Sequence, residues 1–206
     1  MTPPQLHLRP AVASDLDAIL ALERATDLAP HWPPAAYAGI LEPTDLGAPS
    51  IALGAPFIPR PLRNGWETSS PTPLQTNSDA LQPVNATQRC LFVAEKNGQL
   101  AGFAVGLLHP ATNDPANPAS SGRVAELESV VVSANTRRAG IGRALCRAVL
   151  DWSRSQGATE VVLEVRANST AAIALYSALG FTHAARRPRY YRSPEDDALL
   201  LRFVLQ

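Results

Sequence analysis

The stretch at residues 130–143 constrains this chain of 206 residues more than any other part. It reads VVVSANTRRAGIGR, so three valines typical of a buried strand lead into a loop with glycine at positions 140 and 142. The loop opens directly into an amphipathic helical pattern. Backbone amides at a helix N-terminus lack intrahelical partners, and together with the positive end of the helix dipole they favour a phosphate group. The segment therefore predicts a strand–loop–helix unit with an anion site at its bend.

Three arginines flank the bend and would add charge-assisted contacts to the anion: Arg137, Arg138 and Arg143. Two common phosphate loops do not fit. The segment lacks the Gly-Lys-Ser/Thr of a P-loop, and Leu145 replaces the third glycine of a dinucleotide-binding loop. Taken alone, the glycines also fit an ordinary strand–helix turn. The anion site therefore depends on the surrounding pattern.

The remaining pattern predicts an α/β fold, with antiparallel hairpins before a β-α-β-α-β half and helices on the faces of a mixed sheet. Apolar residues recur with helical spacing from Ser14 toward Pro30, and Glu23 falls on the opposite side of that helix. Asn97-Gly98 joins two apolar runs and suits a two-residue hairpin turn. The predicted strands are 6–11, 90–96, 99–108, 124–132, 158–165, 181–191 and 196–205, and the predicted helices are 14–30, 34–41, 143–157 and 169–180.

Residues 42–88 differ from the rest of the chain. They hold eight of the 19 prolines and show no sustained helical or strand period. A structureless stretch of this length is unusual within a compact domain. We expect one domain over residues 6–206, with 42–88 as an irregular proline-rich insertion.

Composition argues against several functional classes. Basic and acidic residues number 18 each, whereas a general nucleic-acid-binding protein needs an excess of cations. No run approaches the roughly 20 apolar residues that span a bilayer, and the N-terminus lacks the basic start and apolar run of a secretion signal. The four histidines and two cysteines are scattered without ligand spacing, so no metal site is expected. These features predict a cytoplasmic protein without nucleic-acid or membrane partners.

The glycine loop and the segment after it resemble a known family. The pattern RxxGxG at 137–142, after VVV and before an amphipathic helix, is similar to the acetyl-CoA motif of the GNAT superfamily of N-acetyltransferases. LEVRANSTAAIALYSALGF at 163–181 resembles the RimI-type enzymes, which acetylate the N-terminal amine of a ribosomal protein. Shorter matches are HWPPAAY at 31–37, RPRYY at 187–191 and DDA at 196–198. The resemblance covers residues 6–41 and 90–206 and does not extend to the insertion.

The resemblance implies a GNAT-type acyl-CoA N-acyltransferase fold, in which two neighbouring parallel strands splay apart and the pantetheine arm of acetyl-CoA pairs with one exposed edge. Here that edge would be 130–132, and the pyrophosphate would lie on the amides of 138–143. An N–H near Val131 or Val132 would polarise the thioester carbonyl and stabilise the oxyanion. The cofactor-binding residues implied in this way are Val130, Val131, Val132, Arg137, Arg138, Ala139, Gly140, Ile141, Gly142, Arg143, Asn168 and Ser169.

The same resemblance implies an acid and a base. An amine that attacks a thioester must lose a proton, and the departing thiolate gains one. By match to the RimI-type motif, Glu164 is the general base, acting through water, and Tyr176 is the general acid facing the same cleft. The alternatives are a structural ion pair between Glu164 and Arg166, and a core position for Tyr176.

Two glutamates on the strand before the loop are rival bases. Glu126 and Glu128 would lie on the same side as Val130 unless a bulge shifts the alternation of side chains. The chain also departs from the family at one cofactor contact. Ser169 replaces the asparagine that usually precedes the tyrosine by seven residues, and Asn168 lies one residue earlier. Either the helix start shifts, or the Ser169 hydroxyl takes that contact.

The resemblance implies an acceptor that is the N-terminal amine of a protein, such as a ribosomal protein. It would enter between the arginine- and tyrosine-rich segment 186–192 and the helix–loop around Trp32 and Tyr37, where Asp196 would meet a basic second residue. A small amine, such as an aminoglycoside, polyamine or amino acid, is the alternative acceptor, since the insertion overlies the region where acceptors bind. A non-catalytic acyl-CoA-binding module is the third interpretation, and the joint presence of a candidate base and a candidate acid argues against it.

Overall fold

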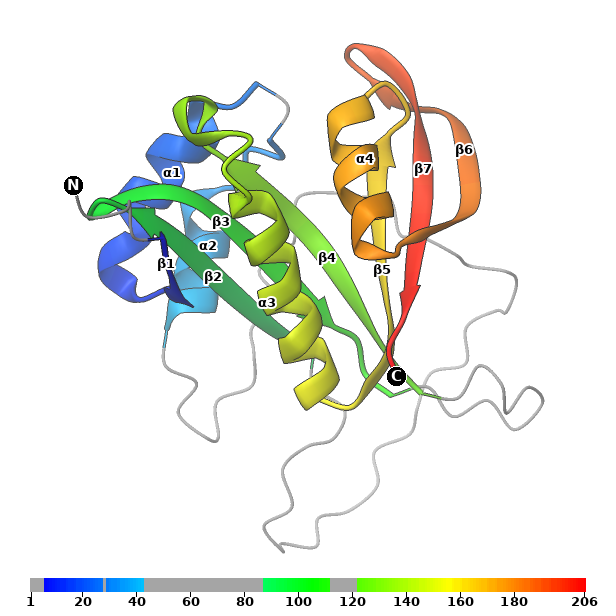
Figure 1. Cartoon of the computed structure of the whole chain (residues 1–206), viewed down its shortest axis with the longest axis horizontal. Helices are drawn as coiled ribbons and strands as arrows, with labels where there is room; N and C mark the ends of the chain where they lie inside the picture. The colour runs from blue at the N-terminus through cyan, green and yellow to red at the C-terminus, as the bar shows by residue number, and fades with distance from the viewer. Residues whose placement is uncertain (1–5, 28, 43–86, 112–121) are drawn as a thin grey trace, which may run out of the picture.

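The computed structural model describes residues 6–27, 29–42, 87–111 and 122–206. Its strands are β1 Leu6–Pro10, β2 Gln88–Lys96, β3 Gln99–Leu108, β4 Arg123–Val132, β5 Ala158–Arg166, β6 Thr182–Arg192 and β7 Glu195–Val204, and its α-helices are α1 Leu16–Arg24, α2 Pro34–Leu41, α3 Ile141–Ser155 and α4 Thr170–Leu179. The strands form one sheet in the order β1-β2-β3-β4-β5-β7-β6, in which only β4 and β5 are parallel neighbours. Helices α3 and α4 cover one face, and α1 and α2 cover the other (Figure 1).

The predicted mixed α/β sheet and the predicted order of elements are confirmed within the described residues. Most boundaries differ by one or two residues, as where β2 begins at Gln88 rather than Cys90, and the largest difference is that α1 ends at Arg24 rather than near Pro30. The predicted insertion at 42–88 falls almost entirely on residues 43–86, which lie outside the described residues.

Local sequence accounts for the β2–β3 hairpin. Asn97 has φ of 54° and Gly98 has φ of 74°, so both central residues of the turn are left-handed. A two-residue turn of this kind matches the twist of the flanking strands, and asparagine and glycine adopt it at the lowest cost. The predicted Asn97-Gly98 turn is therefore confirmed.

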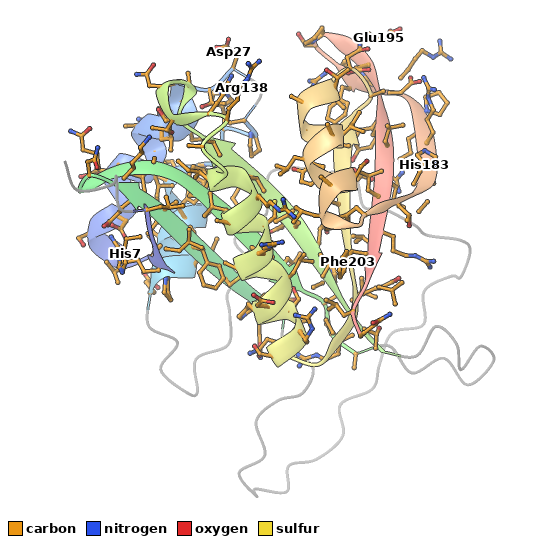
Figure 2. All side chains as sticks on the ribbon, in the orientation of Figure 1. His7, Asp27, Arg138, His183, Glu195 and Phe203 are labelled. Carbon is orange, nitrogen blue, oxygen red and sulfur yellow. The ribbon has the colours of Figure 1, made fainter. Side chains whose placement is uncertain are left out.

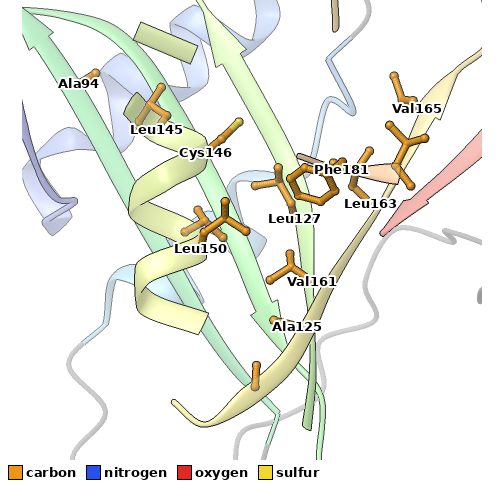
Figure 3. Packing of buried hydrophobic residues seen from close by; sticks show 14 of the residues in the cluster. Ala94, Ala125, Leu127, Leu145, Cys146, Leu150, Val161, Leu163, Val165 and Phe181 are labelled. Carbon is orange, nitrogen blue, oxygen red and sulfur yellow. The ribbon is translucent and has the colours of Figure 1, made fainter. Parts of the chain in front are cut away.

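Helix α3 is held against the sheet by a continuous apolar layer, the α3-side core. Leu145 and Val149 are fully buried in one cluster with Leu127 of β4 and Leu163 of β5. Figure 3 shows Leu145, Leu127 and Leu163 within this layer. Burying one such aliphatic side chain stabilises the fold by about 1.5–3 kcal/mol. This layer fixes the helix, and with it the glycine loop at its N-terminus. None of the helices in the described ranges is long and apolar enough to cross a membrane.

The opposite face of the sheet carries a second core beneath α1 and α2, which contains an acidic side chain. Glu23 was expected on the polar side of its helix, but it is only 1% exposed. Its Oε1 accepts the Tyr37 hydroxyl at 2.5 Å and the Trp32 backbone N–H at 3.0 Å. Buried polar groups are tolerated where hydrogen-bond partners satisfy them, and these two donors explain why Glu23 lies in the core instead of on the polar side of its helix. Trp32 and Tyr37, expected beside the acceptor entrance, are themselves buried, so their side chains are not exposed to an acceptor.

Strands β4 and β5 separate halfway along their length. They pair from Arg123 opposite Ala158 to Glu126 opposite Val162, and no pairing between them follows. Both strands continue, β4 on its pairing with β3 and β5 on its pairing with β7, and they diverge toward the glycine loop (Figure 1). The splayed parallel strands that the sequence resemblance implied are therefore present.

A β-bulge lies on β4 where the two strands separate. Gly106 of β3 is opposite Leu127 and Val105 is opposite Ser129, so Glu128 is the extra residue. A bulge shifts the alternation of side chains between the two faces. Leu127 packs in the α3-side core before the bulge, and Val130 packs there after it.

Candidate active site

The loop between β4 and α3 exposes its backbone. Residues 137–140 are exposed, whereas Ile141 at the start of α3 is buried. Arg138 has φ of 62° and Gly140, the N-cap of α3, has φ of 78°, so two left-handed residues bend the chain sharply into the helix. Figure 2 shows Arg138 on this bend. The amides of the first helical turn have no intrahelical partner, and the bend leaves them open to an anion.

Positive charge surrounds these amides. Arg138 and Arg143 form no ion pair with any described residue, and Arg137 makes only a long contact of 3.5 Å from its Nε to the Val132 carbonyl oxygen. Guanidinium groups form strong, charge-assisted hydrogen bonds to phosphate. The loop therefore offers both main-chain and side-chain donors to a diphosphate.

The second glycine of the loop lets two helices approach. A Cβ on Gly142 would lie 3.2 Å from Cδ2 of Leu175 on α4 and 3.6 Å from Cγ2 of Val132. The first of these distances is tighter than an ordinary van der Waals contact. The motif glycine thus allows α3 to begin close to α4, beside the end of β4.

The edge of β4 that faces β5 has no strand partner beyond Glu126. Residues 130–132 continue to pair with β3 on their other edge. The unpaired N–H and C=O groups on this edge can form hydrogen bonds with an extended, amide-containing chain, in the way that a further strand adds to a sheet. Exposed loop amides, free guanidinium groups and an open strand edge fit the diphosphate and the pantetheine arm of acetyl-CoA.

Glu164 lies on β5, on the face of the sheet opposite to Leu163 and Val165, which pack in the α3-side core. Its side chain is 10% exposed, and its Oε1 lies 3.2 Å from Nη1 of Arg187. The Tyr190 hydroxyl donates a hydrogen bond to the same carboxylate. Burial raises the pKa of the Glu164 carboxyl above its ordinary value, and this effect outweighs the hydrogen bond from Tyr190 and the positive charge of Arg187.

The alternative partner suggested for Glu164 is engaged elsewhere. Arg166 donates to the carbonyl oxygens of Ser193 at 3.2 Å and Pro194 at 3.0 Å, and its guanidinium lies 4.0 Å from the centroid of the Tyr191 ring. Arg187, not Arg166, is therefore the cation beside Glu164.

Tyr176 lies on α4 and packs on the other face of β5, against the α3-side core. Its ring meets that of Phe181 edge-on, with 5.8 Å between the centroids. Burial raises the pKa of the Tyr176 hydroxyl well above its ordinary value, so the hydroxyl keeps its proton at neutral pH. Glu164 and Tyr176 thus lie on opposite faces of β5, beside the stretch where β4 has left it.

The rival bases lie on the same face as Glu164, not on the side of Val130, because the bulge at Glu128 shifts the alternation. Glu128 accepts two hydrogen bonds from Arg89, at 2.9 and 3.1 Å, and burial raises the pKa of its carboxyl. Glu126 lies 3.3 Å from Nε2 of His109. Each carboxylate on this face therefore has its own cationic or titratable partner.

The two candidates for the missing asparagine are also placed. Ser169 is the N-cap of α4, and its carbonyl accepts the N–H of Ile173 at 3.0 Å. Its hydroxyl makes no capping bond, so it stays free for another contact. The exposed Asn168 donates its backbone N–H to Asp196 at 3.3 Å. Ser169 thus lies at the start of α4 and Asn168 one residue before it.

Sequence reasoning placed the tyrosines of 186–192 beside the acceptor but missed their convergence on Glu164. It also assigned no role to Asp197, which lies opposite them on β7. The repeated tyrosines and arginines indicated that this hairpin lies near the acceptor. Which of their side chains reach β5 depends on the pairing between β6 and β7, which the sequence does not show. Within the described ranges no group of three potential metal ligands gathers.

Comparison with known proteins identifies the family. A sequence model of the acetyltransferase (GNAT) family matches residues 58–181. The [ribosomal protein bS18]-alanine N-acetyltransferase of Escherichia coli strain K12 is 34% identical over 114 residues, which cover 53% of this chain and 68% of that protein.

Solved structures share the fold. The ribosomal-protein-S18-alanine N-acetyltransferase from Escherichia coli aligns with a TM-score of 0.61 at 22% identity, covering 98% of this chain and 95% of that one. Arabidopsis thaliana NAA60 in complex with acetyl-CoA aligns with a TM-score of 0.64 at 16% identity, covering 98% of this chain and 100% of that one. The family match covers more than half of the chain, and the chain therefore belongs to the GNAT family of N-acetyltransferases.

Proposed function

We propose that this acetyltransferase moves the acetyl group of acetyl-CoA to the N-terminal α-amine of a protein. The acceptor class is supported by the similarity to the bS18-alanine N-acetyltransferase and by the LEVR…ALY..LGF segment that carries Glu164 and Tyr176. A ribosomal protein is the first acceptor to test. In this proposal residues 6–206 form one domain with an insertion at 42–88, and the enzyme acts in the cytoplasm.

One observation carries the proposal: β4 and β5 splay apart next to the exposed β4–α3 loop, whose arginines form no ion pair with a described residue. The amides of residues 138–143 would hold the pyrophosphate, and the open edge at 130–132 would hold the pantetheine arm. Ser169 would add a hydroxyl contact, with Asn168 beside it. Acetyl-CoA supplies an activated acyl carbon, and the chain orients that carbon in the gap between the two strands.

Side chains and a backbone amide of the chain would accept and donate the protons of the reaction and stabilise the oxyanion. Glu164 accepts the proton that the attacking amine loses as the C–N bond forms, through a bridging water. A backbone N–H near Val131 or Val132 donates to the developing oxyanion. As the C–S bond breaks, Tyr176 gives its proton to the thiolate. Glu128 is the alternative base, but its two hydrogen bonds from Arg89 leave its carboxylate less free than that of Glu164.

A peptide panel tests the proposed acceptor. CoA release is measured with peptides that start with Ala-Arg, with the same peptides carrying an acetylated N-terminus, and with free polyamines. We expect turnover only with the free N-termini. Turnover with polyamines alone would overturn the proposal. A Glu164→Gln/Tyr176→Phe double variant with undiminished turnover would contradict the proposed acid and base.

A further inference from the structure

Strand β6 has a bulge where its pairing with β7 shifts register, opposite a single acidic residue. Arg187 pairs with Ala198 and Tyr191 pairs with Asp196, so three residues of β6, at 188–190, face only Asp197 of β7. Arg189, at the centre of this bulge, has φ of 51°. A non-glycine residue in the left-handed region costs free energy, so such a bulge needs a partner that holds it.

The Asp197 carboxylate provides that hold. Its Oδ1 accepts the backbone N–H of Arg189 at 2.7 Å, and its Oδ2 accepts Nε of Arg186 at 2.6 Å. The Arg189 amide, followed by the Arg186 guanidinium, keeps the pKa of Asp197 below its ordinary value, so the carboxylate stays ionised. One side chain of β7 thus ties together both sides of the bulge in β6.

The bulge has a consequence on β5. In a regular strand, residues three apart point to opposite faces of the sheet, so Arg187 and Tyr190 would point in opposite directions. Here both meet Glu164: the Arg187 guanidinium lies 3.2 Å from its Oε1, and the Tyr190 hydroxyl donates to the carboxylate. The Arg187 guanidinium also lies 5.5 Å from the centroid of the Tyr190 ring. The bulge is what brings the Tyr190 hydroxyl to the same carboxylate as the Arg187 guanidinium.

We propose that Asp197 is a positioning residue for Glu164: by clamping the β6 bulge, it keeps both Arg187 and Tyr190 on that carboxylate. The inference rests on the proposed function for the use of Glu164 as the base, but the clamp itself rests on the contacts above. The charged and titratable groups that face Glu164 are Arg187, Tyr190 and Tyr191 of β6 and Glu126 of β4.

An Asp197→Ala variant tests the clamp. Losing the bulge withdraws the Tyr190 hydrogen bond and moves the Arg187 charge away, and both favour the ionised carboxylate, so the pKa of Glu164 should rise. Carbon-13 NMR titration of the Glu164 carboxyl reads this directly and needs no acceptor. The acid limb of kcat/KM for the acceptor, the fall in rate that protonation of Glu164 causes, should move to higher pH. We expect kcat/KM at neutral pH to fall about tenfold, with KM for acetyl-CoA unchanged.

Two further variants sharpen the result. Asp197→Asn keeps an acceptor for the Arg189 amide but loses the charge, so it should shift the pKa of Glu164 in the same direction by less. Glu160→Gln is the matched control, because Glu160 of β5 pairs with Arg202 at 3.7 Å and its side chain is 28% exposed, against 22% for Asp197. Glu160→Gln should leave both readouts unchanged.

The outcomes separate the clamp from the proposed function. An unshifted Glu164 titration in folded Asp197→Ala, or an equal shift in Glu160→Gln, would overturn the clamp even if the peptide panel succeeds. A shifted titration without turnover of any peptide would support the clamp while the proposed acceptor fails.

Discussion

Two glutamate–tyrosine pairs lie on the same face of the sheet, and their surroundings differ. Under α1 and α2, Glu23 accepts the hydroxyl of a fully buried Tyr37 and the Trp32 amide. Beside the splayed strands, Glu164 accepts the hydroxyl of Tyr190 and forms an ion pair with the Arg187 guanidinium. The first pair lies over β3 and β4, which stay hydrogen-bonded, whereas Glu164 lies on a strand that has lost its pairing with β4 on one edge. We infer that strand pairing, not the chemistry of the pair, separates the structural carboxylate from the proposed catalytic one.

Replacing the carboxylate at the splay should have the largest effect. Glu164→Gln keeps the size of the side chain but removes the base, so kcat/KM for the acceptor should fall by about 10²–10⁴-fold. The melting temperature should stay within a few degrees of the parent. Steady-state kinetics and thermal unfolding of the same sample measure both quantities. A full retention of activity would transfer the base role to another group, with Glu128 as the first to test.

Replacing Glu23, the buried carboxylate of α1, should have the opposite effect: a loss of stability with unchanged activity. Glu23→Ala leaves the Tyr37 hydroxyl and the Trp32 amide buried without an acceptor, so the free energy of unfolding should fall by about 3 kcal/mol. The kcat of the folded enzyme should not change. Urea unfolding measures the loss, and Asp17→Ala, an exposed position on the same helix, is the control that should cost little. Equal losses in the two variants would contradict the structural role of Glu23.

The pH dependence of the parent enzyme sharpens the comparison further. The acceptor α-amine, with an ordinary pKa of about 7.7–8.0, must be deprotonated to attack, so kcat/KM should fall about tenfold per unit below that range. Protonation of Glu164 adds a second tenfold fall per unit below its own pKa, which burial holds above the ordinary glutamate value of 4.5. In Glu164→Gln only the fall due to the amine should remain. A parent profile without the second fall would remove Glu164 from the reaction.

Features set by neighbouring residues along the chain could be predicted from the sequence. The Asn97-Gly98 turn, the glycine bend before α3 and the order of strands and helices follow from backbone preferences and local periodicity. The splay of β4 and β5 was available only through the family resemblance, since no local pattern shows where two distant strands stop pairing.

Features that depend on contacts between strands and helices far apart in the sequence could not be predicted. The bulge at Glu128 moves two glutamates to the other face, and it is visible only in the pairing with β3. Glu23 is buried because its acceptor capacity is used by Tyr37, fourteen residues away on another helix. Tyr190 reaches Glu164, beside Arg187, because of the bulge in β6. In each case contacts between residues far apart in the sequence override the alternation of polar and apolar residues on which sequence reasoning depends.

The smallest expected effects come from removing one hydroxyl from each pair. Tyr37→Phe removes a hydrogen-bond donor from the buried carboxylate of Glu23, so it should lower the free energy of unfolding by about 1–2 kcal/mol and leave kcat/KM unchanged. Tyr190→Phe takes a donor from a carboxylate that keeps Arg187 and partial exposure, so it should cost less than about 0.5 kcal/mol. It should nevertheless lower kcat/KM a few-fold and move the acid limb to higher pH, because Tyr190 favours the ionised form of Glu164. Chemical unfolding and pH–rate profiles of the two variants measure the contrast. Equal stability losses with no kinetic difference would mean that the splay of β4 and β5 does not distinguish the two pairs.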